Sequence, residues 1–171
     1  MKDAIKRLEA FHQAFKIPIG DGAKLPTRNE QILHHRLLSE ELEEFKNGCE
    51  NGDLPNVAHE LADIMFIVLS SVVSHGLQDS FQEVFEEICD ANMSKLKPCP
   101  QHESFIGDET VQKGCCNNPN CISTHREPLY REDGKVERGS EYFYPDVKTI
   151  IERHNAAREN KSMIKRQIDN D

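Results

Sequence analysis

The sequence lacks a hydrophobic run long enough to cross a bilayer. Its longest apolar stretch, residues 64–69 (IMFIVL), continues only through residues 70–73 (SSVV) and is flanked by acidic residues, whereas a membrane-spanning helix needs about 20 consecutive apolar residues. The N-terminal stretch MKDAIKRLEAFHQAF contains neither the apolar segment nor the small-residue cleavage site of a signal peptide. We therefore expect a soluble, cytoplasmic protein with no membrane partner.

Positive charge is also scarce. The chain has 21 Lys and Arg residues against 30 Asp and Glu residues, which gives a net charge of −9. Binding to nucleic acid requires clustered Lys and Arg side chains that neutralise phosphates, so we expect no nucleic-acid partner. The acidic excess is compatible with a site for divalent cations, because such sites collect carboxylates. An ordinary solvated acidic surface would give the same total charge.

The six cysteines do not form a recognisable metal-binding or disulfide pattern. In an intracellular protein they are thiols or metal ligands rather than disulfides. Four of them fall in residues 97–126, a segment without apolar periodicity that we interpret as an insertion. No paired C-x-x-C is present, so free thiols are the favoured interpretation and a zinc site is the alternative. The candidate zinc ligands are Cys99, Cys115, Cys116 and Cys121, with His102 and His125 in the same segment.

Helical periodicity dominates the rest of the chain. Apolar residues at helical spacing predict a first helix over residues 2–15 and a second over about 30–48, capped by Asn29. A third helix opens near Pro55 and runs to about Gly76. A fourth, capped by Asp79 or Ser80, runs to about Leu96 and is stopped by two prolines.

The remaining segments complete a single domain. Residues 127–139 predict a small hairpin around the Asp133-Gly134 turn, and a last helix begins after Tyr144-Pro145-Asp146. We predict an all-α fold with a four-helix core bundle, a C-terminal hairpin and an extra helix. Residues 1–96 would be the helical catalytic core, 97–126 the Cys-rich insertion, and 127–171 the part that completes the same domain.

Two carboxylates of the second helix lie on its apolar side. With about 100° per residue, Glu41 and Glu44 fall within the arc that also holds Leu37 and Phe45, whereas Glu43 falls on the opposite, polar side. A run of charged residues usually marks a solvated face, and Glu43 fits that description. The positions of Glu41 and Glu44 do not.

The third helix repeats this anomaly with Glu60 and Asp63, one turn apart on a helix that is apolar nearly all round. An unpaired buried carboxylate costs several kcal/mol or takes up a proton. Bound divalent cations would compensate all four acids, and the alternatives are buried salt bridges or partial exposure. Oxygen ligands suit Mg²⁺ or Mn²⁺, and a di-iron site is disfavoured because it needs two Glu-x-x-His motifs and the sequence contains one, from Glu9 to His12.

These acids form a pattern that resembles a known family. The residues 40–44 (EELEE) and 60–63 (ELAD) are similar to the EExxE…ExxD signature of the all-α NTP pyrophosphohydrolase superfamily, the MazG and dimeric dUTPase type. Residues 92–96 (NMSKL) resemble its next motif. The segment Phe11-His12 and the tail 133–136 with 144–146 resemble its phosphoribosyl-ATP pyrophosphohydrolase-like branch. The resemblance covers about residues 5–96 and 128–150, and the insertion departs from it.

The resemblance implies hydrolysis of a nucleotide between its α- and β-phosphates, with Mg²⁺ as cofactor and Mn²⁺ as a substitute. The implied metal ligands are Glu41, Glu44, Glu60 and Asp63, and the implied catalytic residues are Glu40 and Glu41. Glu40 would be a further ligand or would help to activate water.

Three further residues are implied or suggested as substrate contacts. Asn92 and Lys95 are one helical turn apart and can face the same phosphates, and a plain surface lysine is the alternative for Lys95. His12 would contact the base or ribose, or lie on the surface of the first helix. The three tyrosines at 130, 142 and 144 would stack on a base or pin the tail to the bundle.

The third helix also bears on assembly. It is apolar around more of its circumference than one small bundle covers, so we expect a homodimer or a dimer of dimers. The leading function is control of a nucleotide pool, in which damaged or surplus nucleotides are removed. One alternative is phosphoribosyl-ATP pyrophosphohydrolysis, and another is a non-catalytic module that binds metal or nucleotide.

Overall fold

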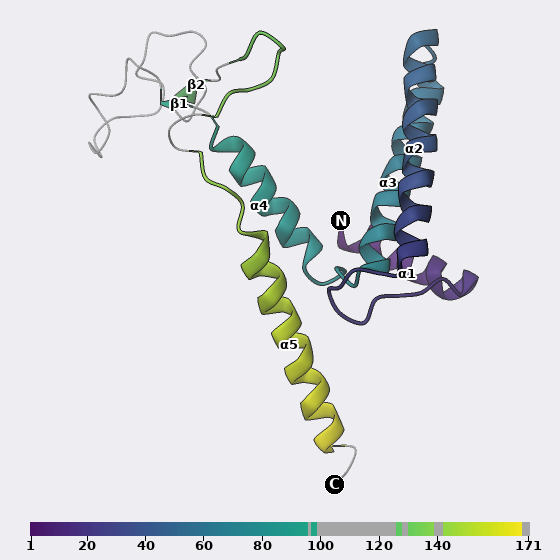
Figure 1. Ribbon diagram of the computed structural model, residues 1–171, viewed down its shortest axis with the longest axis vertical. Helices are drawn as coiled ribbons and strands as arrows, with labels where there is room; N and C mark the ends of the chain where they lie inside the picture. The colour runs from purple at the N-terminus through teal and green to yellow at the C-terminus, as the bar shows by residue number, and fades with distance from the viewer. Residues whose placement is uncertain (96, 99–125, 128–129, 139–141, 169–171) are drawn as a thin grey trace. The chain divides into compact units, whose positions relative to one another are not determined.

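The computed structural model describes residues 1–95, 97–98, 126–127, 130–138 and 142–168. These residues form five helices and two short strands, which confirms the predicted all-α class (Figure 1). The four-helix core stays a prediction. The elements are α1 (Lys2–Phe15), α2 (Arg28–Asn51), α3 (Leu54–Ser74), α4 (Phe81–Met93), β1 (Lys97–Pro98), β2 (Arg126–Glu127) and α5 (Val147–Ile168).

The chain divides into two compact units, and each is described by itself. The first unit comprises Met1–Val84 and Val147–Asp171, and the second comprises Phe85–Asp146. The first unit therefore contains α1, α2, α3, the beginning of α4, and α5. The second contains the rest of α4 and the β1–β2 pair.

The ends of α2 differ from the sequence-based prediction. Thr27, rather than Asn29, caps the helix: its side chain accepts a hydrogen bond from the Glu30 amide, and the Glu30 carboxylate accepts one from the Thr27 amide at 2.8 Å. This reciprocal pair is a capping box, which needs Thr and Glu three residues apart. The helix also continues past Gly48 to Asn51, because Gly52, at φ 68°, supplies the left-handed residue that ends it.

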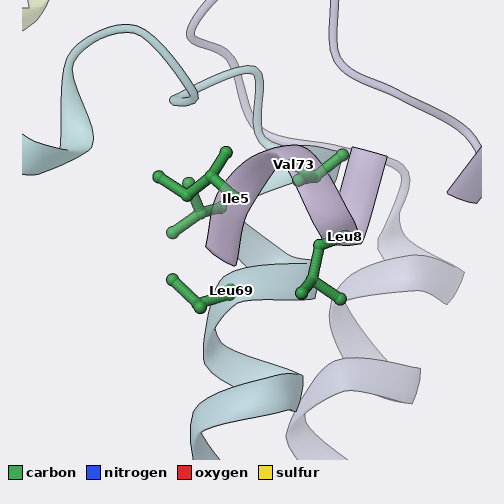
Figure 2. Packing of buried hydrophobic residues seen from close by; sticks show 5 residues of the cluster. Ile5, Leu8, Leu69 and Val73 are labelled. Atoms are coloured by element: carbon green, nitrogen blue, oxygen red, sulfur yellow. The ribbon is translucent and has the colours of Figure 1, made fainter. Parts of the chain in front are cut away.

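The core of the first unit forms where α1 crosses α3. Ile5 and Leu8 of α1 are buried against Leu69, Val72 and Val73 of α3 (Figure 2). Positions 5 and 8 of α1, and 69 with 72 and 73 of α3, follow the three- and four-residue spacing that puts side chains on one helix face. The apolar spacing seen in the sequence therefore identifies the surfaces that meet.

The loop after α1 is held tightly against the end of α3. The Gly20 amide donates to the Val73 carbonyl at 2.9 Å, and the Lys24 amide donates to the His75 carbonyl at 3.0 Å. The backbone approach is so close that a Cβ on Gly20 would lie 2.2 Å from the Gly76 nitrogen. A side chain at position 20 would therefore force the loop and the α3 terminus apart.

Helix α5 is tied to the same unit by polar contacts. The Asn155 side chain accepts from the Ala23 amide at 3.0 Å and donates to the Ala23 carbonyl at 3.4 Å. The Glu83 carboxylate accepts from His154 Nε2 at 2.9 Å and also pairs with Arg153. Both partners hold the pKa of Glu83 below its ordinary value, with the His154 hydrogen bond as the larger cause.

The second unit contains the predicted turn at Asp133-Gly134. Tyr130 and Val136 form an antiparallel bridge, and the Arg131 amide donates to the Lys135 carbonyl at 2.8 Å. Gly134, at φ 78°, takes the left-handed conformation that such a tight turn requires. β1 and β2 pair antiparallel, which the sequence did not predict. The candidate zinc ligands Cys99, Cys115, Cys116 and Cys121 lie outside the described residues.

Candidate metal centre

Helices α2 and α3 form an antiparallel hairpin that brings their acids to the same height. The two helices lie side by side (Figure 1), and Asp53 starts α3 by accepting a hydrogen bond from the Asn56 amide at 3.1 Å. Glu41 lies twelve residues before Asp53, and Asp63 lies ten residues after it. With equal rise per residue in both helices, the two acids face each other across the hairpin.

Three carboxylates meet at this level. One oxygen each of Glu41, Glu60 and Asp63 lies within 4.8 Å of the others. Glu60 is only 3% exposed, whereas Glu41 and Asp63 are half-buried. We call this group the acid cluster. The structure therefore brings together three of the four carboxylates that the sequence suggested as metal ligands.

The acid cluster is electrostatically crowded. The pKa of the Glu41 carboxyl is raised, first because burial disfavours its charged form and then because the charge of Asp63 repels it. The neighbouring carboxyls of Glu60 and Glu44 act in the same direction. A divalent cation among these oxygens would remove the repulsion and favour the ionised form of every member.

The buried carboxylate of Glu60 is only half satisfied. Its Oε1 accepts a hydrogen bond from Asn56 Nδ2 at 2.9 Å, and its Oε2 is buried with no hydrogen-bond donor among the described residues. Buried polar atoms are almost always paired. A buried carboxylate that has an unpaired oxygen and lies close to two other carboxylates is the observation expected of a metal ligand.

The donor set also fits a hard cation in its geometry. Oxygens of an octahedral Mg²⁺ site are bound at about 2.1 Å and so lie at most about 4.2 Å apart. The acid cluster, with its oxygens within 4.8 Å of one another, reaches that spacing by small rotations of carboxylates. Glu41, Glu60 and Asp63 are therefore the residues that could hold a metal ion.

Two residues of α3 that support the acid cluster were missed by the sequence analysis. Asn56 donates to Glu60, and His59 Nε2 lies 3.0 Å from Asp63 Oδ2. Each is four residues before its carboxylate, which is the spacing at which side chains of one helix meet. That spacing was visible in the sequence.

The remaining acids of α2 lie outside the acid cluster. Glu44 is exposed and acts on Glu41 only through its charge. Glu40 is exposed and lies 3.7 Å from Arg36 Nε as a surface ion pair. Glu43 pairs with Lys46 at 2.9 Å on the polar side of the helix, where its position in the sequence placed it.

His12 lies in the interior of the first unit and not on the surface of α1. It is completely buried, with Nδ1 3.0 Å from the Pro18 carbonyl and Nε2 2.7 Å from Ser70 Oγ. Because a carbonyl only accepts, Nδ1 carries the proton and Nε2 accepts from the Ser70 hydroxyl. In this arrangement the ring has no nitrogen left for a base or a ribose.

Asn92 and Lys95 lie in the second unit, at the end of α4. The Lys95 ammonium donates to Asn92 Oδ1, and Asn92 Nδ2 donates to the Ile88 carbonyl at 2.8 Å. The one-turn spacing has thus brought these two side chains together. Their contact with phosphates stays a prediction.

Comparison with known proteins points in the same direction. The family model for phosphoribosyl-ATP pyrophosphohydrolase matches residues 8–92. The matched segment includes α2, α3 and every member of the acid cluster. No curated protein matches the chain.

Proposed function

We propose a function for this chain from its family, because the chain belongs, through residues 8–92, to the phosphoribosyl-ATP pyrophosphohydrolase family of the all-α NTP pyrophosphohydrolase superfamily. The family supports a pyrophosphohydrolase that acts on phosphoric anhydrides. Our proposal is Mg²⁺-dependent hydrolysis of a nucleoside triphosphate between its α- and β-phosphates. The products would be a nucleoside monophosphate and pyrophosphate, and the role would be control of a nucleotide pool.

The buried carboxylate of Glu60 carries this proposal, because it lies beside Glu41 and Asp63 and one of its oxygens has no partner among the described residues. A bound divalent cation supplies positive charge to the phosphate oxygens and lowers the pKa of a water molecule. Glu60 and Asp63 hold the ion from α3, and Glu41 holds it from α2. Asn56 fixes the Glu60 carboxylate, and His59 restrains Asp63. Glu40 and Glu44 stay candidates for a further ligand or for the activation of water.

Phosphoribosyl-ATP is a second candidate substrate, favoured by the name of the family whose model matches. It contains the same α–β anhydride bond, so the acid cluster would serve either reaction. A nucleoside triphosphate and phosphoribosyl-ATP differ in the groups that the protein must recognise beyond the phosphates. Measuring which of them is hydrolysed efficiently distinguishes the two reactions.

The products of a substrate panel test the proposal. The protein is incubated with Mg²⁺ and each of the canonical nucleoside triphosphates, several modified ones, and phosphoribosyl-ATP. We expect pyrophosphate release, with oxygen from ¹⁸O-labelled water appearing in the monophosphate product. Label found only in pyrophosphate would place the attack at the β-phosphorus. Absence of turnover with every substrate would favour a non-catalytic binding module.

We also propose that the chain works as a homodimer or a dimer of dimers in the cytoplasm. Leu61 and Met65 of α3 are 51% and 53% exposed in the single chain. In the described part of the chain, α3 is the helix long and apolar enough to cross a membrane. A helix at the centre of an oligomer is also long and apolar. The charged side chains of Glu60 and Asp63 favour the centre of an oligomer over the interior of a membrane. Light scattering at micromolar concentration should give a dimer or larger, and a monomer would contradict this.

A further inference from the structure

The second unit contains a hollow that is rich in positive charge. An open cavity of about 730 Å³ is lined by Lys95, Arg131, Lys135, Val136, Glu137 and Arg138. Four of these side chains are cationic and one is a carboxylate, although the whole chain carries a net charge of −9. We call it the basic hollow. Such a local excess of cations repels itself unless an anion is present.

The tight turn after Tyr130 brings two of these cations together. The Arg131 amide donates to the Lys135 carbonyl at 2.8 Å, so the two residues lie opposite each other at the neck of the turn. Asp133 Oδ1 accepts from the Lys135 amide at 3.1 Å, and Asp133 Oδ2 lies 3.0 Å from the Arg131 guanidinium. The turn thus positions Lys135 through its backbone and Arg131 through an ion pair with Asp133, which offsets part of the charge of Arg131.

Arg138 and Lys95 are positioned by neutral groups. The Arg138 guanidinium lies 4.8 Å from the centre of the Tyr142 ring and 5.1 Å from that of Tyr144, and it donates to the Tyr144 hydroxyl at 2.9 Å. Lys95 donates to the amide oxygen of Asn92. These partners orient the two cations without neutralising them. The ion pairs among the described residues include neither Lys95 nor Arg138, so the charge of both is available to a ligand.

We propose that the basic hollow binds the phosphate groups of a nucleotide directly, without a divalent cation. Guanidinium groups match phosphate oxygens with two parallel hydrogen bonds, and ammonium groups add compact charge. The volume lies within the range of about 300–1,000 Å³ that is typical of small-molecule sites. The nucleotide as source of the phosphates rests on the proposed function, whereas the recognition of the anion does not.

Calorimetric titration of the full chain in chelator, with inorganic pyrophosphate and then with a non-hydrolysable triphosphate analogue, tests this site. Both ligands should bind without metal, and binding should weaken as salt is raised. The double variant Lys135→Gln/Arg138→Gln should bind pyrophosphate about tenfold or more weakly, because two charged contacts are lost. Lys6→Gln, an exposed lysine of α1, is the matched control and should bind as the original chain does.

Two comparisons separate this inference from the proposed hydrolysis and from a folding defect. Glu60→Gln should lose hydrolysis and keep metal-free binding of pyrophosphate. Arg138→Lys keeps the charge and should recover part of the affinity that Arg138→Gln loses. The inference is overturned if pyrophosphate binds only with metal, if the double variant binds it as tightly as the original chain, or if a single-stranded oligonucleotide binds while pyrophosphate and the triphosphate analogue do not. Binding of pyrophosphate but not of the analogue would overturn the nucleotide as its source.

Discussion

Two buried polar side chains at the two halves of α3 are satisfied to different degrees, although Ser74 Oγ in the C-terminal half also has no partner among the described residues. In the C-terminal half, Ser70 satisfies His12, whose other nitrogen is satisfied by the Pro18 carbonyl. In the N-terminal half, one oxygen of Glu60 has no partner among the described residues, and the Glu60 carboxylate lies close to those of Glu41 and Asp63. Local rules of polar satisfaction tend to fail where a ligand belongs. The comparison assigns stability to the C-terminal half of α3 and ligand binding to its N-terminal half.

The largest expected effect is on catalysis, from Glu60→Gln. The substitution keeps the shape and the Asn56 contact but removes one charge from the acid cluster. Activity with Mg²⁺ should fall about 10²-fold or more, which is typical when a group that stabilises developing charge is lost. Metal-free stability should hold or rise, because repulsion among the carboxylates decreases. Steady-state kinetics and thermal unfolding in chelator measure the two effects.

Glu43→Gln is the matched control for that variant. Glu43 lies on α2 two residues from Glu41 but pairs with Lys46 at the surface. It should change neither activity nor metal-free stability. Loss of activity in Glu43→Gln together with full activity in Glu60→Gln would refute the argument from helix faces.

The opposite signature is expected for His12→Ala, at the α1 residue that contacts Ser70 in the C-terminal half of α3. The variant removes a fully buried ring and two hydrogen bonds, so the free energy of unfolding should fall by about 2–4 kcal/mol. At a temperature where the variant is folded, kcat and KM should stay close to those of the original chain. A raised KM without loss of stability would restore a substrate role for His12. Gln13→Ala, at an exposed neighbour, should have little effect on unfolding.

The acid cluster and the buried His12 also differ in how far each could be predicted from the sequence. The helices and the positions of Glu41, Glu60 and Asp63 follow from a 3.6-residue period, which is a local property. Thr27 could have been identified as the cap from Glu30 three residues on, and His59 from its spacing to Asp63. The burial of His12 depends on Ser70 and Pro18, 58 and 6 residues away in the chain. The basic hollow depends on a turn and on stacking upon tyrosines, which no period encodes.

A smaller effect tests the cap of the helix that supplies Glu41. Thr27→Ala removes the capping box of α2 and should lower the free energy of unfolding by about 1 kcal/mol. Asn29→Ala, at the cap predicted from the sequence, should have almost no effect. Chemical denaturation of the two variants measures the difference. A larger loss from Asn29→Ala would mean that α2 begins later than Thr27.

The smallest expected effect is at Glu83, which contacts neither His12 nor the acid cluster. There the free energy of unfolding should depend on pH. Its folded pKa is lowered by His154 and Arg153, so its contribution to stability is present above the unfolded pKa of about 4.5 and is lost as pH falls through the folded value. Glu83→Gln should therefore be less stable than the original chain at pH 6, and the difference should shrink below pH 4. A difference that stays constant across that range would contradict the ion pairs.

Direct titration of the metal tests the central claim most simply, because it requires no knowledge of the substrate. Mn²⁺ binding, followed by electron paramagnetic resonance, is compared in the original chain and in the variants Glu60→Gln, Glu41→Gln and Glu43→Gln. The original chain and Glu43→Gln should bind the ion alike, and both variants of the acid cluster should bind it about tenfold or more weakly. Equal binding by all four proteins would show that Glu41, Glu60 and Asp63 do not form a metal centre.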